Sequence, residues 1–335
     1  MSPVKPAILV CRRVLPETLE RLRAHFAVEA NQADAEWSRD ELAEHLQGKV
    51  GAFITSTQPI DATLLDRCPE LRAICSMSTG YNNVDVPACT ARGVLFANAP
   101  DVLTETTADF GFALMMAAAR RITESEHFLR RGEWTKWTVD LFAGADIHGA
   151  TLAILGMGRI GRAVARRGAR GFDMPVIYHN RSRLDASVEA ELGARYVGKD
   201  ELFAAADHLV VVVPYSAESH HLVGAAELKR MKPGATLTNI ARGGVVDDNA
   251  LARALREGMI AAAGLDVFEG EPSVHPDLLT LTNVVLTPHI ASASLPTRLA
   301  MAELAAVNLI AALDDRPGAP MPPTALNPQV LARRL

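Results

Sequence analysis

An arginine, a glutamate and a histidine accompany three apolar runs in the second half of the chain. Arg242 follows "TLTNIA", Glu271 lies in "GLDVFEGEP", and His289 lies near the end of "VVLTPHI". Hydride transfer to a 2-oxo acid needs a cation for the carboxylate and carbonyl, and a proton donor for the developing alkoxide. Arginine and histidine suit these tasks, and a nearby glutamate favours the imidazolium form of a histidine. Taken singly, each residue could equally be an ordinary surface or structural side chain.

The stretch "GMGRIG" places Gly156, Gly158 and Gly161 directly after the apolar run 151–155 and at the opening of a helical pattern. The first glycine permits a tight turn, the second lets backbone N–H groups reach a pyrophosphate, and the third allows close helix-to-strand packing. The helix N-terminus adds a favourable potential for phosphates. We therefore predict a dinucleotide-binding loop here. The residues between the glycines, Met157, Arg159 and Ile160, complete it.

The apolar run that follows ends in "YHNRSR", where a dinucleotide-binding unit usually carries an acidic residue for the adenosine ribose. Here Asn180 is followed by Arg181, Ser182 and Arg183, with no carboxylate before Asp185. A 2′-phosphate is repelled by a carboxylate but accepts hydrogen bonds from guanidinium groups and a hydroxyl. The stretch therefore predicts NADP(H) in preference to NAD(H), with NAD(H) still possible. The alternative interpretation is that both arginines are solvated loop charges.

Short apolar runs alternate with helix-like segments along the chain, a pattern typical of parallel sheets built from strand–helix–strand units. The first series of expected strands lies at 7–10, 52–56, 73–78 and 93–99, and the second at 151–156, 175–180, 208–214, 235–241, 260–267 and 284–290. The segment 104–131 predicts one long helix that Gly132 ends, and 296–313 a closing helix. We predict an α/β fold with two parallel-sheet domains, as 335 residues also suggest.

The composition favours a soluble cytoplasmic protein. With 34 basic and 39 acidic side chains the net charge is −5, which gives no electrostatic reason to expect a nucleic-acid partner. The N-terminal apolar run 7–10 is too short for a signal peptide. The longest apolar stretch, 112–119, is well short of the ~20 residues of a membrane span. We expect neither export nor membrane insertion.

The sequence suggests no metal site. The four cysteines have no Cys-x-x-Cys pair and no metal-ligand spacing, which fits a reducing compartment. They are Cys11, Cys68, Cys75 and Cys89. His220 and His221 are adjacent, and adjacent side chains rarely face one ligand. No partner cluster for them is visible in the sequence, so we assign no metal.

Six longer stretches match the signatures of a known family, in that family's order. They are "STGYNNVDV" (78–86), "NAPDVLTETTAD" (98–109), "ILGMGRIG" (154–161), "NIARGGVVDDNAL" (239–251), "GLDVFEGEP" (264–272) and "TPHIASAS" (287–294). The chain resembles the D-2-hydroxyacid dehydrogenases from about residue 5 to 328. Within that family it is similar to the glyoxylate and hydroxypyruvate reductases, including the 2-ketogluconate reductases.

The resemblance implies roles for individual residues. Arg242 would bind the substrate carboxylate and carbonyl, His289 would be the acid/base, and Glu271 would orient His289. It also implies substrate contacts from Thr79, Gly80 and Ser292, and from Trp137 or Trp134 of the neighbouring subunit of a homodimer. Alternatively, the tryptophans pack within their own subunit. Further coenzyme contacts are expected at Val213, Pro214, Ile240, Ala241 and Asp266.

The resemblance also implies a domain division. Residues 1–102 and 292–335 would form a flavodoxin-like substrate-binding domain, and 103–291 an inserted Rossmann domain for the coenzyme. The segment 104–131 would be a hinge and dimer element. Members specific for NAD usually carry an aspartate near the position of Asn180, and its absence here points to the NADPH-using reductases.

The expected activity is therefore NADPH-dependent reduction of a small 2-oxo acid to the D-2-hydroxy acid. Glyoxylate, hydroxypyruvate and possibly 2-ketogluconate are the candidate substrates. One alternative is a phosphoglycerate-, formate- or phosphite-type dehydrogenase of the same family. The last two generally use NAD, against the arginines, and the phosphoglycerate type often has an extra domain that 335 residues do not accommodate. Another alternative is an NAD(H)-responsive corepressor, for which no partner-binding tail is evident.

Overall fold

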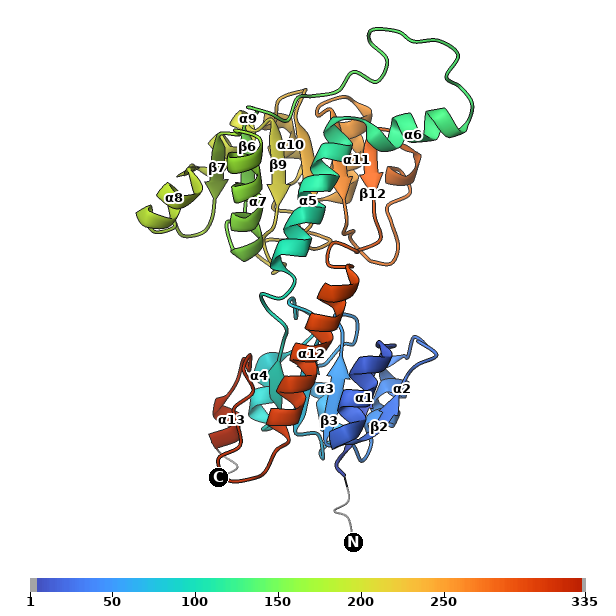
Figure 1. The fold of residues 1–335 in the computed structure, drawn as a ribbon, viewed down its shortest axis with the longest axis vertical. Helices are drawn as coiled ribbons and strands as arrows, with labels where there is room; N and C mark the ends of the chain where they lie inside the picture. The colour runs from blue at the N-terminus through green and yellow to red at the C-terminus, as the bar shows by residue number, and fades with distance from the viewer. Residues whose placement is uncertain (1–4, 333–335) are drawn as a thin grey trace. The chain divides into compact units, whose positions relative to one another are not determined.

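The computed structural model describes residues 5–332, which divide into two compact units (Figure 1). Unit 1 contains the chain up to Leu103 and again from Ser294 onward, and unit 2 is Thr104–Ala293. These boundaries lie within two residues of the expected ones. Each unit is built on one parallel sheet covered by helices, so the predicted α/β fold class is confirmed.

Unit 1 has a five-stranded sheet in the order β2-β1-β3-β4-β5. Its strands are β1 (Ala7–Val10), β2 (Ala27–Ala30), β3 (Gly51–Ile54), β4 (Ala73–Ser76) and β5 (Leu95–Ala97). All neighbours are parallel, and the order is that of flavodoxin-like sheets. The strands β3, β4 and β5 are buried along their whole length, as strands covered on both faces are. The edge strand β2, with sequence "AVEA", is partly exposed.

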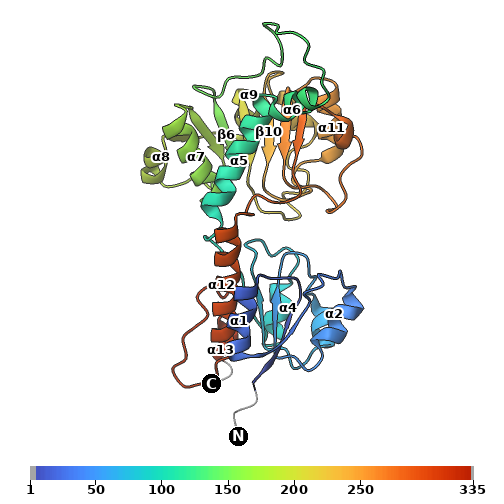
Figure 2. The same cartoon turned by 45° about the vertical axis from the view of Figure 1, so that its right-hand side comes forward.

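Helices cover both faces of this sheet (Figure 2). They are α1 (Pro16–His25), α2 (Arg39–Leu46), α3 (Ala62–Asp66), α4 (Val86–Ala91), α12 (Leu295–Ala312) and α13 (Gln329–Ala332). The start of α2 is fixed by a capping box in which Ser38 and Glu41 bond each other's backbone N–H groups. Asp61 and Asp85 cap α3 and α4 through their carboxylates.

The C-terminal helix α12 belongs to the core of unit 1. Its Ala305 and Leu309 are fully buried in one cluster with Ile8 and Phe53 of the sheet. The chain beyond it is held along β5, where Asn327 accepts a hydrogen bond from the N–H of Phe96. Among residues 5–332, α12 is the one helix long and apolar enough to cross a membrane, and half of it is buried inside the protein.

Unit 2 has a seven-stranded parallel sheet in the order β12-β11-β10-β9-β6-β7-β8. Its strands are β6 (Leu152–Leu155), β7 (Val176–His179), β8 (Ala194–Tyr196), β9 (His208–Val211), β10 (Thr236–Asn239), β11 (Ala262–Leu265) and β12 (Val284–Leu286). The order reverses between β6 and β9, which are neighbours. Ligands of such sheets bind at this switch point, beyond the carboxyl ends of the strands.

The helices of unit 2 flank this sheet. They are α5 (Thr104–Ala119), α6 (Ile122–Arg130), α7 (Arg159–Gly171), α8 (Ala186–Leu192), α9 (Lys199–Ala205), α10 (Ala225–Arg230) and α11 (Asp248–Arg256), with one 3-10 turn, η1 (Leu278–Thr280). Two glycines let α5 pack closely on the sheet, because neither position has room for a side chain. A Cβ at Gly111 would lie 2.5 Å from Ile240 Cδ1, and a Cβ at Gly264 would lie 2.7 Å from Leu114 Cγ.

The prediction of one continuous helix over 104–131 is wrong. The helix breaks between α5 and α6 at Arg121, whose backbone is left-handed with φ +52°. The returning chain closes on the end of α5, because Ala145 N–H donates to Ala119 O at 2.9 Å. Gly144 packs so closely there that a Cβ would lie 2.3 Å from the same oxygen. The carbonyl that would continue the helix is therefore used by another segment.

Candidate active site

Arg242, Glu271 and His289 follow three neighbouring strands of unit 2. The last residues of β10, β11 and β12 are aligned in register, since Asn239 pairs with Leu265 and Leu265 with Leu286. Because these strands are parallel, the loops that leave them emerge at the same edge of the sheet. The structure therefore gathers the three polar side chains that the sequence singled out.

Glu271 and His289 are in direct contact. His289 Nδ1–H donates to Glu271 Oε2 at 2.7 Å, because an ionised carboxylate can only accept. The other oxygen, Oε1, accepts the N–H of Phe268 at 2.9 Å. Because Nδ1 is hydrogen-bonded to Glu271, Nε2 is the ring atom of His289 that can exchange a proton with a bound molecule.

The backbone at His289 is left-handed, with φ +52°, a conformation that costs a non-glycine residue about 1–3 kcal/mol. Asp266 holds the turn in this state. Its carboxylate, 1% exposed, accepts hydrogen bonds from the Thr287 hydroxyl and from the N–H groups of Ile290 and Ala291, at 2.7 to 2.8 Å. Burial raises the pKa of Asp266. The structure places this residue beneath the histidine turn, and the coenzyme contact expected for it stays a prediction.

The arginine loop packs directly on the glutamate loop. A Cβ at Gly243 would lie 1.7 Å from Phe268 O, so only glycine fits beside Arg242. Burial lowers the pKa of Arg242 and the charge of Glu271 opposes this, but a guanidinium stays protonated in proteins. Burial alone would raise the pKa of Glu271. The contacts with His289 and the Phe268 N–H, together with the charge of Arg242, outweigh burial and hold that pKa below its ordinary value.

The predicted dinucleotide loop lies at the switch point, after β6. Gly156 has φ +105°, and a Cβ there would lie 2.9 Å from the backbone N of Val213. A Cβ at Gly161 would lie 2.2 Å from Gly156 O, whereas one at Gly158 would meet nothing within 4 Å. The first and third glycines are thus required by packing, and the second leaves an open face at the start of α7. Met157, Arg159 and Ile160 lie in the loop and the first turn of α7.

This loop fits a dinucleotide. Gly158 precedes α7 without any side-chain cap, so N–H groups of its first turn can bond a phosphate. Asn180 fixes the loop from the neighbouring strand, because its Oδ1 accepts the Met157 N–H at 2.6 Å.

The two arginines after β7 differ in their surroundings. The side chain of Arg181 is 89% exposed and has Glu218 at 3.5 Å. Arg183 donates from Nε and Nη2 to Glu189 of α8, and the Tyr178 hydroxyl donates to the same carboxylate at 2.7 Å. These bonds lower the pKa of Glu189. Sequence reasoning missed this anchor, which occupies two of the three guanidinium nitrogens of Arg183. Ser182 is exposed between the arginines.

The remaining expected coenzyme contacts fall into two groups. Val213 and Pro214 follow β9 beside the dinucleotide loop, and Pro214 is exposed. Ile240 and Ala241 follow β10, and both side chains are buried in the cores of unit 2. A ligand can therefore reach Ile240 and Ala241 only through their backbone.

In unit 1, Thr79 and Gly80 follow β4 at the carboxyl edge of that sheet. The Thr79 hydroxyl donates to Ala99 O and the Thr79 carbonyl accepts from Asn98 Nδ2, both at 2.7 Å, so this loop is held on both sides. Ser292 belongs to unit 2, in the turn that follows His289.

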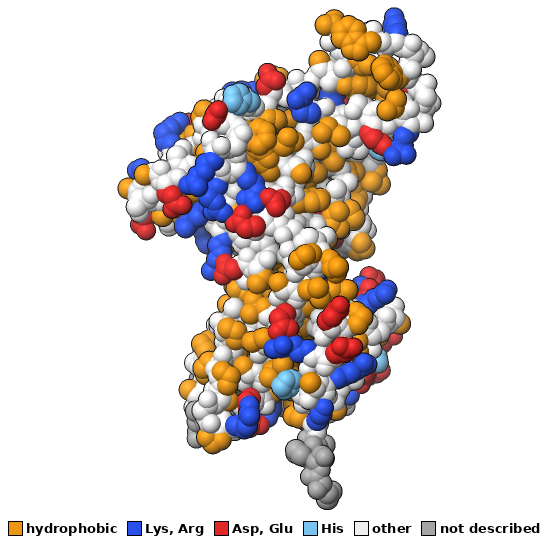
Figure 3. Space-filling model, in the orientation of Figure 1, with side chains coloured by type: hydrophobic (Ala, Val, Ile, Leu, Met, Phe, Trp, Pro, Cys, Tyr) orange, Lys and Arg blue, Asp and Glu red, His pale blue; other side chains and the backbone are white. Residues whose placement is uncertain are grey.

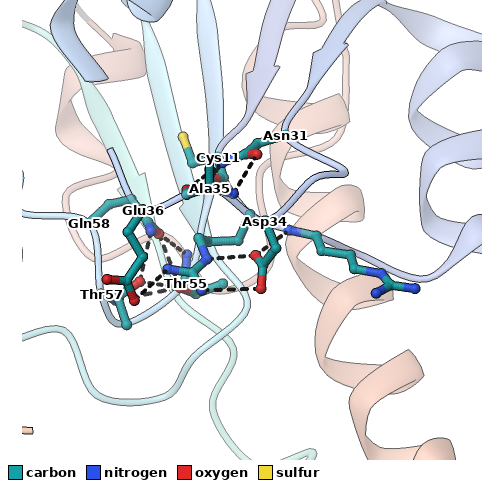
Figure 4. Close-up of polar contacts among 10 residues, drawn as sticks. Cys11, Asn31, Asp34, Ala35, Glu36, Thr55, Thr57 and Gln58 are labelled. Atoms are coloured by element: carbon teal, nitrogen blue, oxygen red, sulfur yellow. Dashed lines mark hydrogen bonds and ion pairs between the residues drawn. The ribbon is translucent and has the colours of Figure 1, made fainter. Parts of the chain in front are cut away.

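Side-chain hydrogen bonds hold other loops of unit 1, both within one loop and between two loops (Figure 4). After β3, Gln58 Oε1 accepts from the N–H and the hydroxyl of Thr55, at 2.8 and 3.0 Å. After β1 and β2, Arg12 donates to Asp34 at 2.8 Å. The carboxyl edge of this sheet is therefore a set of fixed polar loops.

The segment after α6 carries the two tryptophans and forms an extended loop (Figure 1). Trp134 is 55% and Trp137 75% exposed, so their own chain leaves more than half of each side chain uncovered. Apolar side chains gather over this loop (Figure 3). The exposed ones are Ile122, Leu129, Trp134, Trp137, Val139 and Leu141. We call these six residues the arm patch.

A glycine-rich dinucleotide loop at the switch point, with an arginine and a Glu–His pair at the same edge of the sheet, defines a nicotinamide-dependent dehydrogenase. The sequence profile of the D-isomer specific 2-hydroxyacid dehydrogenase NAD binding domain matches residues 112–291. The chain belongs to this family, which confirms the resemblance seen in the sequence, and it is an NAD(P)-dependent oxidoreductase.

Relatives match along the whole chain. It is 46% identical over 333 residues to a glyoxylate reductase of Thermococcus onnurineus, with 98% of both chains covered. A glyoxylate reductase structure from Paecilomyes thermophila superposes with a TM-score of 0.85 at 34% identity, covering 97% of this chain and 99% of the other. The structure of an NADPH-dependent glyoxylate/hydroxypyruvate reductase from Sinorhizobium meliloti, in complex with NADP and malonate, superposes with a TM-score of 0.83 at 34% identity. The match covers 97% of each chain.

Proposed function

We propose that the protein reduces glyoxylate to the corresponding 2-hydroxy acid with NADPH as the preferred coenzyme. Hydroxypyruvate and 2-ketogluconate are further candidate substrates, and the products from substituted substrates are D-2-hydroxy acids. The observation that carries this proposal is the contact between Glu271 and His289 beside the half-buried Arg242. The relatives named glyoxylate reductase support the choice of substrate.

Each residue has a defined task in the proposed reaction. Arg242 binds the substrate carboxylate and polarises the 2-oxo group, assisted by Thr79, Gly80 and Ser292. The nicotinamide coenzyme supplies the hydride to C2. His289 Nε2 donates the proton to the carbonyl oxygen as negative charge develops there. Glu271 keeps the ring of His289 in orientation by accepting its Nδ1–H.

The preference for NADPH rests on the loop after β7. No carboxylate is present between Asn180 and Asp185, and Arg181 and Arg183 supply positive charge. Because Arg183 is anchored by Glu189, its position is fixed before a ligand arrives, while Arg181 can move to meet a phosphate. The NADP complex of the Sinorhizobium meliloti relative supports this coenzyme.

We also propose the assembly and the setting of the enzyme. Unit 1 binds the substrate and unit 2 the coenzyme. The arm patch pairs two chains in a homodimer, in which Trp137 or Trp134 contacts the partner's substrate site. The four cysteines, which are buried and unpaired, fit a reducing cytoplasm. Neither a nucleic acid nor a membrane is a partner in this proposal.

The variant His289→Asn tests the proposed function. Asparagine tolerates the left-handed backbone at this position but cannot exchange a proton. With glyoxylate and NADPH, we expect kcat to fall by about 10²–10⁴-fold while the NADPH dissociation constant stays unchanged. Steady-state kinetics and fluorescence titration of NADPH measure the two quantities. Near wild-type turnover in this variant, or no NADPH oxidation by the wild type with glyoxylate, hydroxypyruvate or 2-ketogluconate, would overturn the proposal.

A further inference from the structure

Two loops of unit 2 bring together His220, His221 and Glu269, three side chains that the proposed reaction does not use. His220 and His221 lie between β9 and α10, and Glu269 follows β11. One potential ligand atom from each lies within 4.8 Å of the other two. Among residues 5–332 this is the one group of three histidine, cysteine or acidic side chains with that property.

The backbone explains how adjacent histidines share one side of the loop. His221 has φ +51°, in the left-handed region, so its side chain does not point away from that of His220 as in an extended segment. The two rings are stacked, with centroids 3.9 Å apart and planes at 23°. The reason given from the sequence for dismissing this pair is therefore wrong: the side chains do face one site, and a carboxylate completes it.

The other contacts of the rings orient them. His221 Nε2 lies 2.9 Å from Glu269 Oε2, and its Nδ1 lies 3.7 Å from Asp247 Oδ2. A carboxylate on the far nitrogen of a metal-binding histidine is a recurrent arrangement that fixes the ring and raises its basicity. His220 has its Nδ1 3.3 Å from the Tyr215 hydroxyl, which leaves Nε2 as the atom to coordinate.

We propose that His220, His221 and Glu269 bind one divalent transition-metal ion of the Zn²⁺ or Co²⁺ kind. Two imidazole nitrogens and one carboxylate oxygen form a ligand set that suits these ions, with water in the fourth position. Metal–ligand distances of about 2.0–2.2 Å require the three atoms to move closer together. Because His220 and Glu269 are exposed, rotation of their side chains suffices. The ion takes the place of the proton between His221 and Glu269.

The backbone under the site is already fixed. His221 N–H donates to Gly244 O at 2.7 Å, and Glu269 N–H donates to the buried carboxylate of Asp248 at 2.9 Å. Gly244 is two residues beyond Arg242, and Glu269 is two residues before Glu271. An ion here would join the loops that carry Arg242 and Glu271 without using either side chain.

Binding of Co²⁺ to untagged full-length protein, first stripped with a chelator, tests the proposal. We expect one Co²⁺ per chain, with visible d–d absorption bands, and displacement of Co²⁺ by Zn²⁺. The three variants His220→Ala, His221→Asn and Glu269→Gln should each bind Co²⁺ at least tenfold more weakly, because each lacks one ligand. Asparagine is chosen at His221 because it tolerates the left-handed backbone.

His148→Ala is the matched control, since His148 is an exposed histidine of the same unit with a single carboxylate, Asp173, at 3.9 Å. It should bind Co²⁺ like the wild type. Absence of stoichiometric binding in the wild type, or a Co²⁺ affinity equal to that of the wild type in any of the three ligand variants, would overturn the proposal. So would a loss in His148→Ala as large as in the ligand variants. Melting curves without metal confirm that each variant is folded, and the readout needs no turnover, so it is separate from the test of the proposed reaction.

Discussion

The contact between Glu271 and His289 fixes the orientation of the proposed acid. Since the pKa of Glu271 is held below its ordinary value, this carboxylate is ionised throughout the neutral range. It therefore accepts the Nδ1–H of His289 at 2.7 Å as a charged partner, which leaves Nε2 as the atom that faces a bound molecule. The contact is lost only when the pH falls far enough to protonate Glu271.

Glu271→Gln is expected to weaken this orientation. Glutamine keeps the size of the side chain but removes the charge, so the hydrogen bond to His289 Nδ1 is no longer charge-assisted. We expect kcat for glyoxylate reduction to fall by about tenfold or more, while the NADPH dissociation constant stays unchanged. Steady-state kinetics and fluorescence titration of NADPH measure the two quantities. A kcat equal to that of the wild type would exclude this role for Glu271.

Arg181→Ala tests the proposed coenzyme preference. Removal of a charged hydrogen bond to the 2′-phosphate should raise the KM for NADPH by about tenfold or more and leave that for NADH unchanged. Arg195→Ala is the control, because Arg195 is also exposed on unit 2 and is paired with Glu201. Initial rates with both coenzymes give the comparison. A wild-type preference for NADH that persists in Arg181→Ala would remove the proposal.

Among single residues, the sequence was sufficient to place those that directly follow the end of a strand. Arg242 and His289 could be located because parallel strands end at one edge. The ion pair between Arg183 and Glu189 was not predictable. Nothing in the sequence of the short helix α8 indicates that its glutamate bonds an arginine of the preceding loop. The same holds for His221, because left-handed backbone at a non-glycine residue is set by the surrounding structure.

Among the elements, the dinucleotide loop is one that close packing holds in place. Gly161→Ala would place a Cβ 2.2 Å from Gly156 O, so α7 or the loop must shift. We expect a loss of about 1–3 kcal/mol in the free energy of unfolding and at least tenfold weaker NADPH binding. Denaturant titration and NADPH fluorescence measure the two effects.

The control lies at the other end of the same helix. A Cβ at Gly171 meets nothing within 4 Å, so Gly171→Ala should leave NADPH binding unchanged. It should leave stability unchanged or raise it by up to about 1 kcal/mol, because alanine favours the helix over glycine. If both variants lost NADPH affinity equally, close packing at Gly161 would not be the cause.

The elements that the sequence missed share a physical reason. The edge strands β2 and β8 contain the charged residues Glu29 and Arg195 and are partly exposed, so they lack the apolar run that marked the inner strands. The break at Arg121 was missed because helix-forming residues continue on both sides of it. At this break Arg121 is left-handed and the Ala119 carbonyl accepts from Ala145, a residue distant in the sequence, so no local pattern reveals it.

At the scale of the whole molecule, the arm patch should control assembly. Buried tryptophans commonly contribute most of the affinity of an interface, so the double variant Trp134→Ser with Trp137→Ser should weaken the proposed homodimer more than tenfold. Sedimentation velocity at several concentrations measures this. Leu279→Ser is the control, since Leu279 is also an exposed apolar residue of unit 2, at 62%, outside the patch. A monomeric wild type, or a double variant that dimerises normally, would contradict the prediction.

Unit 1 is assembled from both ends of the chain, and this has a consequence for synthesis on the ribosome. When residue 293 is made, unit 2 has its complete sequence, but unit 1 still lacks α12, whose Ala305 and Leu309 fill its core. Ile8 and Phe53 of the N-terminal strands therefore stay without their cover from α12 until residues 295–312 have been made. We expect the nascent chain to expose this unfinished hydrophobic surface until then, and to need protection by chaperones at that stage.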